Sequence, residues 1–175
     1  MDEDQPGSRI LIIIGNLAML LGAIDPMEGS LLILPGSLLV VIGAWLAQSG
    51  ARLLAYRVWV FIVIAVGVAA LWWLSLLGGF GGLSGRSWWW GCLVLPYPLG
   101  WLMGICGPET PRWALWGGAI VGLWYLAVSA ISVLKLGQAN SAMSNVPALI
   151  LAAVGILVVT GCIYRLRGSA MTPAA

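Results

Sequence analysis

The sequence has 175 residues, of which 61% are hydrophobic and only 8% are charged, and its formal net charge is +2. Soluble domains average roughly 45–50% apolar and about 25% charged residues, so this composition excludes an ordinary water-exposed surface and indicates a protein embedded in lipid. The small net charge and the absence of a Lys/Arg-rich cluster also exclude a nucleic-acid-binding surface.

Six apolar runs predict six transmembrane helices, at residues 9–24, 26–48, 57–78, 88–106, 112–134 and 146–164. A span needs about 20 residues, and the alternation of a membrane β-barrel is absent from the sequence. We therefore predict an all-α polytopic membrane protein, a bundle of six transmembrane helices. Its domain organisation is a short acidic cytoplasmic tail at 1–8, a transmembrane domain at 9–168 and a short cytoplasmic tail at 169–175.

Basic residues flank the predicted spans unequally. Six spans place both termini on one side, together with Arg9, Arg52, Arg57, Arg112, Arg165 and Arg167, whereas the other side holds Arg86 and Lys135. The positive-inside rule then places both termini in the cytoplasm. The N-terminus is acidic, unlike the basic start of a secretory signal. We therefore expect the first run to be retained, in a multi-pass protein of the bacterial inner membrane.

Asp25 and Glu28 separate the first two runs, in the stretch AIDPMEGS at residues 23–30. Asp25 suits a helix N-cap, Pro26 suits the first helical position, and Glu28 follows the cap by three residues, as in a capping box. We favour this interpretation, with a second helix from Pro26 to Gln48. The alternative is a binding site, in which the two carboxylates attract a cation or a basic partner.

The glycine-rich stretch GGFGGLSGRS, residues 78–87, joins the third and fourth runs. It departs from the phosphate-binding pattern G-x-x-x-x-G-K-[ST], because Phe80 replaces the first glycine and Arg86 replaces the lysine. We interpret it as a connector. Arg86 is one of two basic residues predicted on its side of the membrane, so it is a candidate partner for Asp25 or Glu28.

Pro96, Tyr97 and Pro98 fall near the middle of the fourth run, in GCLVLPYPLGWLMG at residues 91–104. Proline inside a helix removes a hydrogen bond and bends the helix, so we expect a broken fourth helix with free carbonyls at about residues 92 and 94. In lipid these carbonyls need partners. We favour a bend packed among neighbouring helices. The alternative is a substrate site of the kind that broken helices form in many transporters.

The remaining chemistry of the sequence is sparse. It contains no histidine, and no acidic or basic residue lies at the centre of a predicted span. Without these groups a nucleophile and its base cannot be assembled, so we expect no enzyme, no cofactor and no metal site. Cys92, Cys106 and Cys162 show no CxxC spacing, and we expect them to be small buried hydrophobes.

Small residues indicate where the helices pack. GSLL occurs at 29–32 and again at 36–39, and Gly118 and Gly122 share a face of the fifth run. Such faces allow close helix contact. The leading hypothesis is a non-enzymatic accessory or structural subunit, whose partners are the lipid bilayer and a second membrane protein or another copy of itself. The alternative is a small channel or facilitator for a neutral or weakly polar solute, which would use the broken fourth helix.

Overall fold

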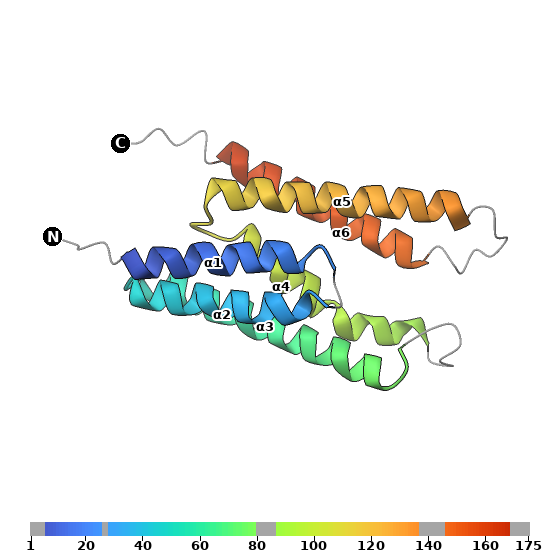
Figure 1. The fold of residues 1–175 in the computed structure, drawn as a ribbon, viewed down its shortest axis with the longest axis horizontal. Coiled ribbons are helices and arrows are strands. Elements are labelled where there is room, and N and C mark those ends of the chain that lie inside the picture. The colour runs from blue at the N-terminus through green and yellow to red at the C-terminus, as the bar shows by residue number, and fades with distance from the viewer. Residues whose placement is uncertain (1–5, 26–27, 80–86, 137–145, 169–175) are drawn as a thin grey trace. The chain divides into compact units, whose positions relative to one another are not determined.

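The computed structural model describes residues 6–25, 28–79, 87–136 and 146–168. These residues contain α-helices, one 3-10 helix and no strand, so the all-α prediction is confirmed. The elements in chain order are α1 (Pro6–Gly22), α2 (Ser30–Leu46), α3 (Ala51–Leu76), η2 (Trp88–Val94), α4 (Pro96–Ile105), α5 (Arg112–Leu136) and α6 (Val146–Gly168) (Figure 1). The chain divides into two compact units, Met1–Pro108 and Glu109–Ala175, called unit 1 and unit 2 below.

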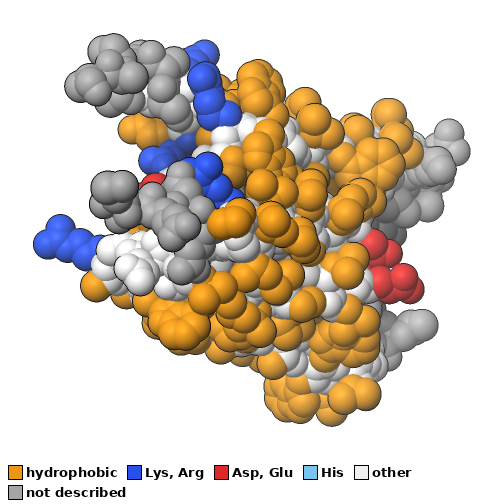
Figure 2. Space-filling view, turned by 60° about the vertical axis from the view of Figure 1, so that its left-hand side comes forward, with side chains coloured by type: hydrophobic (Ala, Val, Ile, Leu, Met, Phe, Trp, Pro, Cys, Tyr) orange, Lys and Arg blue, Asp and Glu red, His pale blue; other side chains and the backbone are white. Residues whose placement is uncertain are grey.

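The lengths of the helices support fewer full spans than the sequence predicts. Three described helical stretches are long and apolar enough to cross a membrane: Ala51–Leu76, Arg112–Leu134 and Ala148–Gly168. The helices α1 and α2 have 17 residues each, which is about 25 Å of helix, against a hydrocarbon core of about 30 Å. The structure therefore supports a membrane protein with three such helices rather than six. Hydrophobic side chains cover most of the face shown in Figure 2.

In unit 1, α1 and α2 pack antiparallel along a seam of small residues that recur at every seventh position. The pairs in contact are Ser8 with Gly43, Gly15 with Gly36, and Gly22 with Gly29. At the central pair, a Cβ added to Gly36 would lie 2.8 Å from the Gly15 carbonyl oxygen and 3.0 Å from the Ala18 Cβ. The two backbones therefore touch directly, and the small-residue face predicted for the second helix is a packing surface. These six residues are called the glycine seam below.

The helix α3 packs against α2 on one side and against η2 and α4 on the other. Gly100 of α4 lies against Ile64 of α3, where an added Cβ would be 2.9 Å from the Ile64 nitrogen. Trp101 of α4 reaches α1, and its indole N–H donates to the Met19 carbonyl at 2.9 Å. The most deeply buried large side chains of unit 1 are Met19, Ile33, Ile64, Leu74 and Ile105. The core of unit 1 therefore draws on all four of its α-helices.

In unit 2, α5 and α6 form an antiparallel pair. Gly122 of α5 lies against Gly155 of α6, where a Cβ on Gly155 would be 2.8 Å from the Gly122 carbonyl oxygen. The Ser129 hydroxyl donates to the Ala148 carbonyl at 2.6 Å, which satisfies a buried polar group across the same interface. Cys162 is buried in unit 2, as expected, whereas Cys92 in unit 1 is exposed, contrary to the expectation for all three cysteines.

Candidate functional site

Asp25 and Glu28 lie in the connection between α1 and α2. The Gly29 N–H donates to the Asp25 carbonyl at 2.8 Å, and the Glu28 N–H donates to Asp25 Oδ1 at 3.4 Å. Asp25 therefore accepts backbone N–H groups through both its carbonyl and its side chain, and the side-chain bond is that of a capping residue. The helix α2 itself begins at Ser30, four residues later than predicted. Both carboxylates are exposed to the surroundings of unit 1.

The structure does not complete a cation site around these two acids. Among the residues with described positions, no group of three or more His, Cys, Asp or Glu side chains is arranged to hold a metal ion. Arg86, the basic residue proposed to pair with Asp25 or Glu28, lies outside the described residues. That pairing stays a prediction.

Pro96, Tyr97 and Pro98 lie where the fourth run is interrupted, because η2 ends at Val94 and α4 begins at Pro96. Leu95 is the N-cap of α4, so Pro96 occupies its first position and Pro98 its third. The first N–H groups of any helix lack an intrahelical acceptor, and two prolines there remove no helical hydrogen bond. The carbonyl of Cys92, predicted to be free, accepts from the Leu95 N–H at 3.2 Å. The predicted break of the fourth run is therefore confirmed, as a change from 3-10 to α-helix at Leu95, whereas the expectation of a free Cys92 carbonyl is wrong.

Tyr97 is buried against α3. A Cβ added to Gly67 of α3 would lie 2.6 Å from the Tyr97 Cβ and closer still to the Tyr97 backbone nitrogen. Only a residue without a side chain leaves room for the first turn of α4 at this point. Tyr97 therefore lies at a packing contact between two helices, which agrees with the favoured interpretation of the proline-rich stretch.

Arg57 is a buried cation that the sequence predicted to lie at the membrane surface. It is 5% exposed, because α3 begins at Ala51, six residues earlier than predicted, and places Arg57 in its second turn. Its guanidinium donates to the Gly104 carbonyl at 3.3 Å and to the Pro108 carbonyl at 2.7 Å. The neighbouring Tyr56 hydroxyl donates to the Met103 carbonyl at 2.8 Å. These bonds satisfy carbonyls at the end of α4, where a positive charge also complements the helix dipole.

Asn16 is a further polar residue that is buried within unit 1. Like Arg57, it was not predicted from the sequence to be a site residue. Its side chain is 0% exposed, and its amide nitrogen donates to the Ile12 carbonyl of the preceding turn at 2.8 Å. Its Oδ1 is buried and has no hydrogen-bond donor among the described residues. Asn16 shares a face of α1 with Met19, which contacts α4 through Gly104. A buried acceptor without a donor is unusual, so the Asn16 Oδ1 is a candidate polar site in the interior of unit 1.

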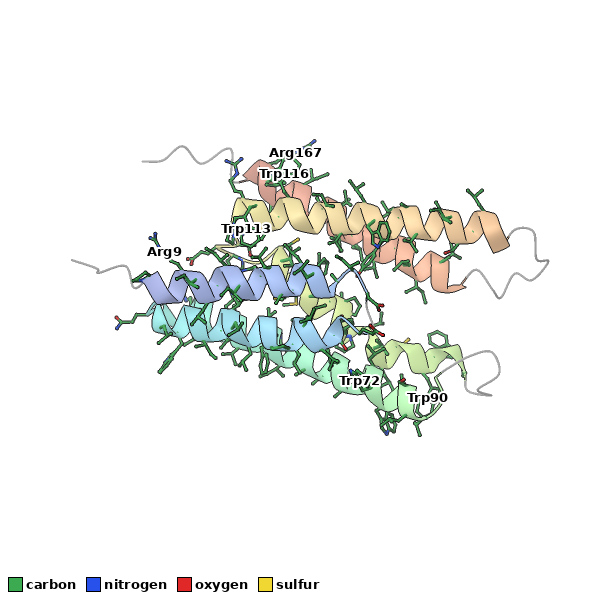
Figure 3. All side chains as sticks on the ribbon, in the orientation of Figure 1. Arg9, Trp72, Trp90, Trp113, Trp116 and Arg167 are labelled. Carbon is green, nitrogen blue, oxygen red and sulfur yellow. The ribbon has the colours of Figure 1, made fainter. Side chains whose placement is uncertain are left out.

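An aromatic cluster lies at the end of unit 1 that also holds the α1–α2 connection. The Trp72 indole N–H donates to the buried Ser30 hydroxyl at 3.1 Å. The rings of Trp73 and Trp90 are 6.1 Å apart and tilted by 40°. Trp72 and Trp90 are labelled in Figure 3, at the opposite end of the unit from Arg9. Tryptophans in this position are typical of a membrane–water interface.

The comparisons with known proteins add no family to this picture. Comparison with protein-family models, with curated proteins and with solved structures gives no match.

Proposed function

We propose that the protein is a multi-pass integral membrane protein of the bacterial inner membrane that acts without catalysis, as an accessory or structural subunit. The observation that supports this role is the outer surface of unit 2. Only 17% of the apolar window in α6 is buried. Large apolar side chains exposed on the two helices are Ile120, Leu123, Trp124, Leu134, Leu149, Ile150, Ile156 and Leu157. A helix that is apolar all round needs lipid or protein on every side.

The distribution of arginines within each unit supports cytoplasmic termini. In unit 1, Arg9 lies in the first turn of α1 and Arg52 in the first turn of α3, at the opposite end from Asp25 and Glu28. In unit 2, α5 begins with Arg112, and the last turn of α6 holds Arg165 and Arg167. Each unit thus has one arginine-rich end, the pattern of the positive-inside rule.

We propose that the shorter helices also cross the bilayer, which gives six crossings. The seven residues of η2 and the ten of α4 together span about 29 Å, at 2.0 Å per residue for a 3-10 helix and 1.5 Å for an α-helix. The helices α1 and α2 are some 5 Å short of the hydrocarbon core. A local thinning of the bilayer accommodates such a mismatch at modest cost.

Cysteine labelling in intact cells tests this topology. In a background with all three native cysteines replaced by serine, we expect Asp25→Cys to react with an impermeant maleimide added outside. Gly50→Cys, in the connection between α2 and α3, should react only after the membrane is permeabilised. Reaction of Gly50→Cys but not Asp25→Cys in intact cells would invert the orientation, and reaction of both would refute the membrane crossing of α2.

Purification tests the subunit role. Native mass spectrometry from a mild detergent should show a second membrane protein, or further copies of this chain, at a fixed stoichiometry. Replacement of Leu123 and Leu149 by alanine, on the exposed faces of α5 and α6, should reduce that stoichiometry. The matched control is Ala114→Gly, at a buried position of the same unit. A monomer under all these conditions would contradict the proposal.

A second candidate function, a facilitator for a neutral or weakly polar solute, is favoured by one observation, the unpartnered Oδ1 of Asn16 within unit 1. A solute that donates a hydrogen bond would satisfy it. The test is flux of urea and glycerol into proteoliposomes, for the natural sequence and for Asn16→Leu. Flux that depends on Asn16 would favour this candidate over the subunit role, and the absence of flux would leave the subunit role as the proposal.

A further inference from the structure

Three arginines lie at one end of unit 2, because Arg112 begins α5 and the last turn of α6 holds Arg165 and Arg167. Gly122 of α5 contacts Gly155 of α6, and one step of seven residues along each helix brings Ser129 to Ala148. Both contacts share one antiparallel register. Ten residues from the glycine pair in the other direction, the same register places Arg112 opposite Arg165.

The last turn of α6 sets the direction of its two arginines. Leu166 is buried, whereas Arg165 and Arg167 on either side of it are exposed. Leu166 therefore anchors the end of α6 to unit 2 while both guanidinium groups stay accessible. Glu109 is the single acidic side chain in the sequence of unit 2, against Arg112, Lys135, Arg165 and Arg167.

The surroundings of the arginines are those of a lipid headgroup region. Trp113 and Trp116 follow Arg112 directly in α5, and Trp116 is 60% exposed. Figure 3 labels both tryptophans and Arg167 at the same ends of α5 and α6. Exposed tryptophan on an otherwise apolar helix marks the depth at which acyl chains give way to headgroups. In the topology proposed above, the three arginines lie on the water side of this depth, at the level of lipid phosphates.

We propose that Arg112, Arg165 and Arg167 bind the phosphate of an anionic phospholipid. Guanidinium groups bind phosphate through paired N–H donors, and a group of them between membrane helices suits an anionic headgroup. The first turn of α5 adds backbone N–H groups, which also favour an anion. A lipid fits better than a soluble phosphate because the tryptophans provide a surface for its acyl chains.

Lipid titration tests this proposal, which rests on the membrane insertion of unit 2. The protein in neutral detergent is titrated with dioleoyl phosphatidylglycerol, with dioleoyl phosphatidylcholine or with inorganic phosphate, and the melting temperature and lipid-bound species in native mass spectra are recorded. We expect phosphatidylglycerol to bind and to raise the melting temperature more than the other two. Removal of each arginine, as Arg112→Gln, Arg165→Gln or Arg167→Gln, should weaken that binding by about fivefold.

Arg52→Gln is the matched control, because Arg52 is an exposed arginine in the first turn of a membrane helix of unit 1. Its affinity for phosphatidylglycerol should be unchanged. Equal binding of the two lipids, an equal effect of inorganic phosphate, or an equal loss in Arg52→Gln would each overturn the proposal. Arg167→Gln alone suffices if the other variants fold poorly, because Arg167 is the last arginine of the final turn. A protein that passes the topology test and fails here refutes only the lipid site.

Discussion

Gly15 of α1 and Gly36 of α2 touch backbone to backbone, so that a Cβ on Gly15 would lie 2.5 Å from the Gly36 carbonyl oxygen. We expect Gly36→Ala to push α1 and α2 apart, because its Cβ would meet the Gly15 carbonyl oxygen at 2.8 Å and the Met19 nitrogen at 3.1 Å. Overpacking of this kind costs about 1–3 kcal/mol. Thermal unfolding in detergent, followed by circular dichroism, measures the loss.

Gly7→Ala is the control for this variant, because Gly7 also lies in α1 and a Cβ there meets nothing within 4 Å. Alanine is the better helix former by about 1 kcal/mol, so Gly7→Ala should be neutral or stabilising. If Gly36→Ala were as stable as Gly7→Ala, the close approach of α1 and α2 would be refuted.

The second prediction concerns Arg57 and the end of α4. Arg57→Met keeps the length of the side chain and removes both of its bonds to the Gly104 and Pro108 carbonyls. Each hydrogen bond from a charged group contributes about 1.5–3 kcal/mol, so we expect a loss of several kcal/mol in the free energy of unfolding. Tyr56→Phe removes one neutral bond and should cost about 1 kcal/mol. An Arg57→Met protein as stable as Tyr56→Phe would show that the guanidinium does not hold α4.

Asn16→Leu supplies the third prediction. Leucine has the branched shape of asparagine without its polar atoms, and the Asn16 Oδ1 lacks a donor within the described chain. An unsatisfied buried acceptor costs about 1–3 kcal/mol, so the variant should melt at a higher temperature. Ser37→Ala is the comparison, because the buried Ser37 hydroxyl already donates to the Leu34 carbonyl at 2.8 Å, and its loss should not stabilise. A lower melting temperature for Asn16→Leu would indicate that Oδ1 accepts from a bound water or solute.

The fourth prediction compares two prolines. Pro35 lies inside α2, whereas Pro98 occupies the third position of α4. Alanine at residue 35 restores a hydrogen bond in the helix interior, so Pro35→Ala should stabilise, by at most about 3 kcal/mol. Pro98→Ala gains no helical bond and should change stability by less than about 0.5 kcal/mol. Denaturation midpoints of both variants decide this, and a larger gain for Pro98→Ala would contradict the position of Pro98 in the first turn of α4.

The apolar runs of the sequence predicted where helices lie but not how each one ends. Hydrophobicity does not distinguish a helix from the turn beside it, so α3 begins six residues before its predicted start and includes Arg57. The prolines of the fourth run predicted its interruption correctly, but not that a new helix begins at Pro96. A proline is disruptive inside a helix and harmless in the first turn, and only the N-cap at Leu95 decides which applies.

Burial of single polar groups was harder still to predict. Asn16 is an isolated polar residue in the apolar sequence of α1, and the lack of a donor for its Oδ1 depends on the residues that pack around it in unit 1. The seven-residue spacing of GSLL, in contrast, predicted a contact face that the structure confirms. A repeat can be recognised in the sequence alone, whereas the surroundings of a buried side chain depend on residues that are distant in the sequence.

Because the small residues of the glycine seam recur every seven positions, more than one alignment of α1 with α2 would bring small residues together. If α2 slid along α1 by seven residues, about 10 Å, Gly22 would face Gly36 and Gly15 would face Gly43, so that small residues would again face each other. Backbone packing alone therefore cannot choose the alignment. The choice falls to the connection between α1 and α2, in which the Gly29 N–H donates to the Asp25 carbonyl at 2.8 Å. The hydrogen bonds of Asp25 thus help to select the alignment of α1 and α2, because a longer connection would permit the shifted hairpin.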